Sequence, residues 1–127
     1  MRASKRVAYG LLALAFAGAA AVHAAALLSP RLDPSAPPWR HALFVGINVA
    51  CALGFVLRPR WLAAPFALLV VQQLFSHGGQ ALRAWREAGR VDVPSLAVLV
   101  VMPLALALLA SDARAAGAGR AGAAGRA

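Results

Sequence analysis

The chain has 127 residues, of which 61% are hydrophobic and 13% are charged, and its mean hydropathy is +0.70. A soluble domain is about 45–50% apolar and about 25% charged, so this composition excludes an ordinary water-soluble enzyme or binding module. The formal charge of +9 lies at the ends of long apolar runs rather than in one basic patch, which argues against nucleic acid as a partner.

The apolar residues form four stretches, each close to the ~20 residues that cross a ~30 Å hydrocarbon core as a helix. The stretches are residues 7–28, 41–57, 62–77 and 93–110. They predict an all-α fold, a polytopic membrane protein built as a four-transmembrane-helix bundle over residues 1–112. The many alanines and arginines are typical of a GC-rich bacterial genome, so we expect the bundle to lie in a bacterial cytoplasmic (inner) membrane.

The first stretch, residues 7–28, follows a cluster of basic residues. Such a start is also typical of a signal peptide, and cleavage after Ala24 is the alternative. The apolar run continues through Leu28 without a polar cleavage region, so we expect a retained membrane anchor. Alanines at every fourth position of this stretch allow another helix to approach closely, in self-association or in a complex with other membrane proteins. These alanines are Ala13, Ala17, Ala21 and Ala25.

The connections between the stretches differ in character. Residues 29–39 contain four prolines, which predict a stiff, extended loop. Residues 58–60 predict a tight turn, which would make the second and third helices an antiparallel hairpin. Residues 80–89 are apolar on one helical face and charged elsewhere, so they form either an amphipathic segment at the outer interface or a straight continuation of the third helix.

The fourth stretch has a clear start, because Asp92 or Val93 is suited to the N-cap position and a proline follows in the first turn. After its end, residues 113–127 consist only of alanine, glycine and arginine. This low-complexity composition predicts a disordered cytoplasmic tail.

Basic residues predict the orientation, since they are enriched on the cytoplasmic side of a membrane protein. With the N-terminus inside, eight basic residues lie in the cytoplasm and five lie outside. The inner residues are Arg2, Lys5, Arg6, Arg58, Arg60, Arg114, Arg120 and Arg126, and the outer ones are Arg31, Arg40, Arg83, Arg86 and Arg90. We therefore expect both termini in the cytoplasm.

Few polar residues lie inside the apolar stretches, and because polar groups are costly in lipid, these are the candidate functional residues. The predicted topology brings His23, His41 and His77 to the outer leaflet. Gln73 shares a helical face with His77, and Asn48 shares one with His41. The five side chains would surround one polar pocket.

Several roles for this pocket remain open. Three imidazoles can bind zinc or copper, two can ligate haem b, and the histidines with the two amides can hydrogen-bond a quinone. Alternatively, the polar groups only hold the helices together. No catalytic motif is present, no cofactor is required by the sequence, and no carboxylate lies inside a stretch, which argues against a proton-coupled exporter. We expect an accessory or structural membrane component rather than an enzyme, with a cofactor-binding membrane protein as the alternative.

Overall fold

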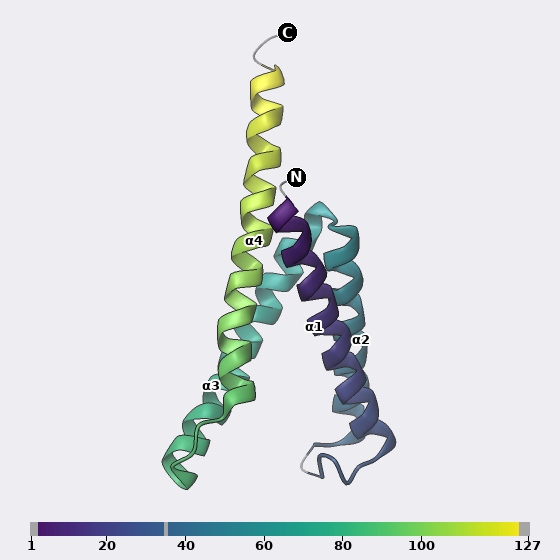
Figure 1. Cartoon of the computed structure of the whole chain (residues 1–127), viewed down its shortest axis with the longest axis vertical. Coiled ribbons are helices and arrows are strands. Elements are labelled where there is room, and N and C mark those ends of the chain that lie inside the picture. Colours follow the sequence, from purple (N-terminus) through teal and green to yellow (C-terminus); the bar gives the residue numbers. More distant parts are fainter. Residues whose placement is uncertain (1–2, 35, 125–127) are drawn as a thin grey trace. The chain divides into compact units, whose positions relative to one another are not determined.

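The structure is a computed structural model that describes residues 3–34 and 36–124, with side chains described as far as residue 115 (Figure 1). All the regular structure in this part of the chain is helical, as predicted. The helices are α1 (Ala3–Leu28), α2 (Pro38–Leu57), a short 3-10 turn η1 (Arg60–Leu62), α3 (Ala63–Ala88) and α4 (Val93–Ala124).

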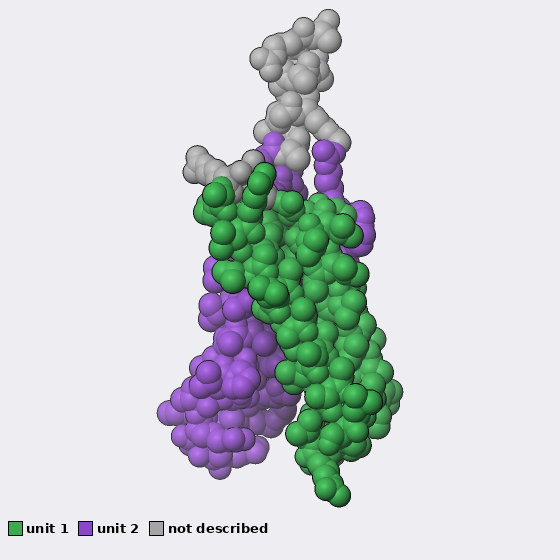
Figure 2. All heavy atoms as spheres, turned by 45° about the vertical axis from the view of Figure 1, so that its right-hand side comes forward, with its two compact units in different colours: residues 1–59 green, residues 60–127 purple. Residues whose placement is uncertain are grey.

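The chain divides into two compact units, residues 1–59 and residues 60–127, which Figure 2 distinguishes by colour. In the first unit α1 packs against α2, and in the second unit α3 packs against α4 (Figure 1). Each unit is therefore a pair of helices joined by a short connection.

Three of the helices are long and apolar enough to cross a membrane. They are Ala3–Leu28, Pro38–Leu57 and Val93–Ala115. These helices contain the first, second and fourth predicted stretches. The third stretch, residues 62–77, lies in α3, which is not among them because it becomes polar from Gln72 onward and carries charged residues from Arg83.

The α3 helix runs without a break across Gly78 and Gly79, so residues 80–88 are a straight continuation of the third helix and not a separate segment. The helix ends at Gly89, whose φ of 58° lies in the left-handed region that glycine adopts without a steric penalty. The backbone N–H of Gly89 donates to the carbonyl of Trp85 at 3.0 Å, which satisfies a carbonyl of the last turn.

The α4 helix continues to Ala124, over residues that the sequence predicts as a disordered tail. Alanine has the highest intrinsic helix propensity, which favours extension of the helix into this alanine-rich segment. The rest of the predicted tail, residues 125–127, lies outside the described residues, as do Arg2 and Arg126 from the charge count.

Aromatic rings fill the core of the first unit. Phe55 on α2 is 1% exposed, and its ring centroid lies 5.4 Å from that of Phe16 and 6.1 Å from that of Tyr9, both on α1. Beside them, Arg58 ends α2 in a left-handed conformation and donates its backbone N–H to the carbonyl of Gly54 at 2.7 Å. The Arg58 guanidinium lies 5.6 Å from the centre of the Tyr9 ring, a cation–π contact that stabilises this end of the unit.

Buried residues in the second unit repeat at helical spacing. On α3 they are Phe66 and Val70, and His77 follows on the same face two turns later. On α4 the buried positions Ser95, Met102 and Leu109 are seven residues apart. This periodicity places both His77 and Ser95 on the packed side of their helices.

Candidate functional site

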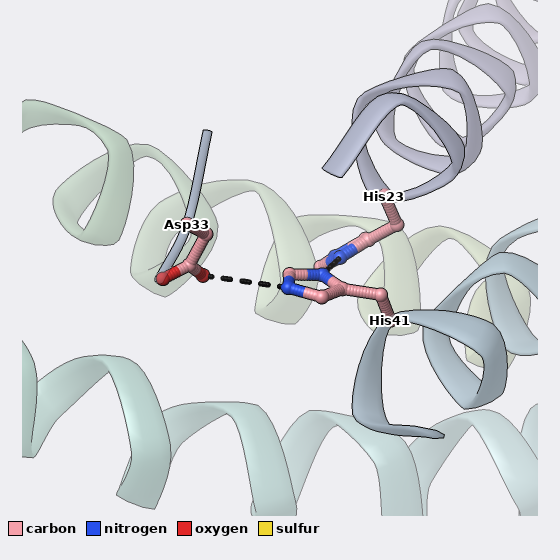
Figure 3. A network of polar contacts seen from close by, with 3 residues as sticks. All are labelled: His23, Asp33 and His41. Atoms are coloured by element: carbon pink, nitrogen blue, oxygen red, sulfur yellow. Dashed lines mark hydrogen bonds and ion pairs between the residues drawn. The ribbon is translucent and has the colours of Figure 1, made fainter. Parts of the chain in front are cut away.

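Two of the predicted histidines lie in contact in the first unit. His23 is near the end of α1 and His41 is in the first turns of α2, and their Nδ1 atoms are 3.1 Å apart (Figure 3). His41 is buried, with 5% of its surface exposed. One of the two Nδ1 atoms must donate and the other accept, so a single proton lies between the two rings.

Asp33, from the loop between α1 and α2, lies on the other side of His41 (Figure 3). Its Oδ2 is 3.7 Å from Nε2 of His41, which is longer than a hydrogen bond. The His41 Nε2 atom is buried and has no hydrogen-bond partner among residues 3–34 and 36–124. His41 therefore has one ring nitrogen paired with His23, while the other faces a carboxylate across a gap.

Prolines in the loop shape the surroundings of this pair. Pro37 is the N-cap of α2 and Pro38 follows at its first helical position, where a missing N–H costs nothing. A pocket of about 380 Å³ opens at this end of the unit, beside Asp33 and His41. Its other lining residues are Ala26, Pro30, Pro34, Ala36, Pro37 and Pro38.

Asn48 lies on the same buried side of α2 as His41, which confirms the predicted shared face. Its amide Nδ2 donates to the backbone carbonyl of Phe44, one turn earlier, at 2.7 Å. Phe44 also stacks on the ring of His23, with centroids 5.1 Å apart. Asn48 thus contacts the backbone of Phe44, and His23 contacts its ring.

His77 belongs to a second polar cluster, centred on Ser95 in the second unit. Ser95 is 1% exposed, and its hydroxyl donates to Oδ2 of Asp92 at 2.7 Å. Nδ1 of His77 lies 3.1 Å from the same hydroxyl oxygen, and Oε1 of Gln80 lies 3.4 Å from it. The backbone N–H of Ser95 donates to Oδ1 of Asp92 at 3.3 Å, which confirms Asp92 as the N-cap of α4.

These contacts hold the pKa of the Asp92 carboxyl below its ordinary value. The hydroxyl of Ser95 is the largest cause, followed by the backbone N–H of Ser95, while the nearby His77 and Arg90 charges add to the effect. The carboxylate form of Asp92 is therefore the form that the folded cluster favours.

Three of the predicted site residues thus have partners within their own units. The structure joins His23 with His41, and it gives His77 partners within its own unit. Gln73 is half-buried on α3, one turn before His77. No group of three or more His, Cys, Asp or Glu side chains among residues 3–34 and 36–124 is placed to hold a metal ion. Convergence of all three histidines on one metal, haem or quinone stays a prediction.

Sequence reasoning missed Asp33 and Ser95, which complete the two clusters. A signal for Ser95 exists, because Asp92 and Ser95 have the spacing of an N-cap residue and the third helical residue that it caps. Asp33 offers only a weak signal, a carboxylate in a proline-rich loop eight residues before His41.

Comparisons with protein-family models, with curated proteins and with solved structures return no match to this chain.

Proposed function

We propose that this chain is a four-span protein of the bacterial cytoplasmic membrane that acts as a non-catalytic accessory component, in association with other membrane helices or with copies of itself. Both termini would lie in the cytoplasm, and α3 would supply the fourth span through its apolar first part.

The apolar surfaces of the helices support a membrane location. Large hydrophobic side chains are exposed along all four helices, and a soluble protein rarely leaves such continuous apolar faces in water. Phe75 on α3 is 80% exposed, so α3 also presents exposed apolar surface, as do the three helices that are long and apolar enough to cross a membrane. The exposed residues include Leu11, Leu14 and Val22 on α1, Leu43, Leu53 and Val56 on α2, Leu68 and Val71 on α3, and Val100 and Leu104 on α4.

The polar residues of the apolar helices favour an accessory role over a catalytic one. His23 contacts His41, and His77 contacts Ser95, so each histidine links the two helices of its own unit. In membranes such interhelical hydrogen bonds stabilise packing by about 0.6 kcal/mol each. These groups act as structural contacts within each helix pair.

The alanine ladder of α1 is the observation that carries the association with other helices. Its members Ala17, Ala21 and Ala25 are exposed, whereas the buried residues of α1 include Phe16 and Ala20. These three alanines are therefore turned away from the buried face of α1, while the first member of the ladder, Ala13, is half-buried. Small residues on an exposed membrane helix allow another backbone to approach closely, which is the main source of helix association in lipid.

Topology reporters test the span count. We expect fusions after Arg60 and Ala127 to report the cytoplasmic side, and fusions after Ser35 and Gly89 to report the external side. The Gly89 fusion is decisive for α3, since a cytoplasmic signal there, with an external signal after Ala127, would mean that only three helices cross the membrane.

The ladder is tested by the double substitution Ala17→Leu and Ala21→Leu. The bulky side chains would keep a second helix at a distance, so we expect the apparent Kd of self-association, or of capture by a membrane partner, to rise about tenfold. Energy transfer between labelled copies in lipid vesicles measures self-association, and co-purification from membranes measures partner capture.

The matched control is Ala15→Leu, since Ala15 is an exposed alanine of the same helix that does not belong to the ladder. It should leave both readouts unchanged. If the double variant and Ala15→Leu associated equally well, or were equally weakened in association, this would contradict association through the ladder.

A further inference from the structure

We propose that Asp33 and His41 bind a divalent transition-metal ion such as Zn²⁺, and that His23 is the positioning residue that orients the His41 ring. This site lies wholly within the first unit, needs no contribution from His77, and does not depend on the accessory role proposed above.

The gap between the two ligands is suited to an ion. Zinc binds histidine nitrogen and carboxylate oxygen at ~2.0–2.2 Å, so two ligands of one tetrahedral ion lie about 3.3–3.6 Å apart. The observed separation between His41 Nε2 and Asp33 Oδ2 is 3.7 Å. This separation is close to the spacing of metal ligands, while a direct hydrogen bond requires a shorter distance of about 2.7–3.2 Å.

Burial of the His41 nitrogen points to a missing ligand. The residue is 5% exposed, and its Nε2 atom makes no hydrogen bond to any part of the chain that the structure describes, although buried polar atoms nearly always have a partner. The atom lies 3.7 Å from the carboxylate of Asp33, and His41 and Asp33 both line the pocket of about 380 Å³. A cation at this place would give the buried nitrogen a partner, with the Asp33 carboxylate as its second ligand.

His23 supplies the support that a metal-binding histidine requires. A histidine that ligates through Nε2 usually donates its Nδ1–H to a neighbouring acceptor, which fixes the tautomer and the direction of the ring. Nδ1 of His41 lies 3.1 Å from Nδ1 of His23, so His23 can accept this hydrogen (Figure 3). The ring of His23 is held in turn by stacking on Phe44.

The pocket provides access and the remaining coordination positions. Asp33 is 42% exposed at its side chain and lies in a loop stiffened by Pro30 and Pro34, so the carboxylate is open to solvent while its backbone is restrained. Water in the pocket would complete the coordination of the ion, as it does where a protein supplies fewer than four ligands.

The test uses the full-length chain, purified in mild detergent through an affinity tag without histidines, and titrated with Zn²⁺ or Co²⁺ alone. We expect one ion per chain and a Co²⁺ absorption spectrum of the tetrahedral type. His41→Ala should abolish binding, and Asp33→Asn should weaken it at least about tenfold, because each removes one ligand. His77→Ala is the matched histidine control and should leave the affinity unchanged.

The role of His23 has its own readout. His23→Leu should weaken binding by about 10–100-fold, whereas His23→Gln should restore most of the affinity because its amide oxygen can accept the His41 Nδ1–H. Helical circular dichroism checks that each variant is folded. If His41→Ala does not fold, the zinc affinity of Asp33→Asn tests the proposed site, because Asp33 lies at a partly exposed loop position. The proposal would be overturned if the parent chain bound no metal, or if folded His41→Ala or Asp33→Asn bound it with undiminished affinity. Loss of binding in His77→Ala would also overturn it.

Discussion

Replacing Phe55 by alanine is expected to lower the free energy of unfolding of the first unit by about 2–3 kcal/mol. The ring is 1% exposed and stacks with Phe16 and Tyr9 across the two helices, so its removal leaves a cavity where the helices meet. Phenylalanine-to-alanine changes in soluble cores cost about 3–5 kcal/mol, and the effect should be smaller here because lipid already solvates apolar groups in the unpacked state. Titration from mild detergent into a denaturing detergent, followed by near-ultraviolet circular dichroism, measures the change.

The matched control for Phe55 is Phe75, a phenylalanine on α3 that is 80% exposed. Phe75→Ala removes the same atoms without opening a cavity, so we expect its free energy of unfolding to stay within about 0.5 kcal/mol of the parent value. Equal losses in the two variants would mean that the aromatic contacts of Phe55 do not stabilise the helix pair.

Replacing Ser95 by alanine is expected to destabilise the second unit by about 2 kcal/mol. The hydroxyl is fully buried, donates to the Asp92 carboxylate and contacts His77 and Gln80, so its loss removes a charge-assisted hydrogen bond and the contacts that join α3 to α4. The same denaturing titration measures this loss. Ser111→Ala is the matched control, because the Ser111 hydroxyl lies at an exposed position and donates to the carbonyl of Leu108, and its effect should stay below about 0.5 kcal/mol.

The same variant should change the response to acid. The pKa of Asp92 is lower in the folded chain than in the unfolded chain, so its ionised form stabilises the fold above the ordinary carboxyl pKa of 3.8. This contribution is lost as the pH falls through the lowered pKa of the folded state. Ser95→Ala removes its largest cause, so unfolding measured between pH 7 and pH 3 should show a weaker acid dependence than in the parent chain. An unchanged dependence would contradict this assignment.

Periodicity and hydropathy predicted much of the fold. The apolar runs located all four helices, and the seven-residue spacing of His41 and Asn48 correctly placed both on one buried face. The end of the fourth helix was less accurate, since α4 continues past residue 110, while the continuation of α3 past Gly78 is one of the two alternatives that the sequence left open. A glycine does not end a helix when the residues around it favour helix. A run of alanines favours continuation of a helix even beyond the residues that pack in a core.

The site could be predicted only in part, because its partners come from outside the helical pattern. A helical period indicates that His41 and His77 are on packed faces, but it does not indicate which side chains face them. Asp33 reaches His41 from an irregular loop, and Ser95 reaches His77 from the first turn of another helix. Such contacts depend on the path of the loop and on the rotation of one helix against the next, which the sequence of either helix does not encode by itself.

The two histidine contacts have a consequence for the order in which the chain is made. His23 with His41, and His77 with Ser95, each join residues only 18 positions apart. Residues 1–59 are synthesised first, and their polar pair needs nothing from the second half of the chain. In a membrane, the first helix pair would leave the ribosome and the insertion machinery with the contact between His23 and His41 already formed, and the second pair would follow with the contact between His77 and Ser95. Each half of this small protein would then insert into the membrane as a helix pair that forms its histidine contact by itself.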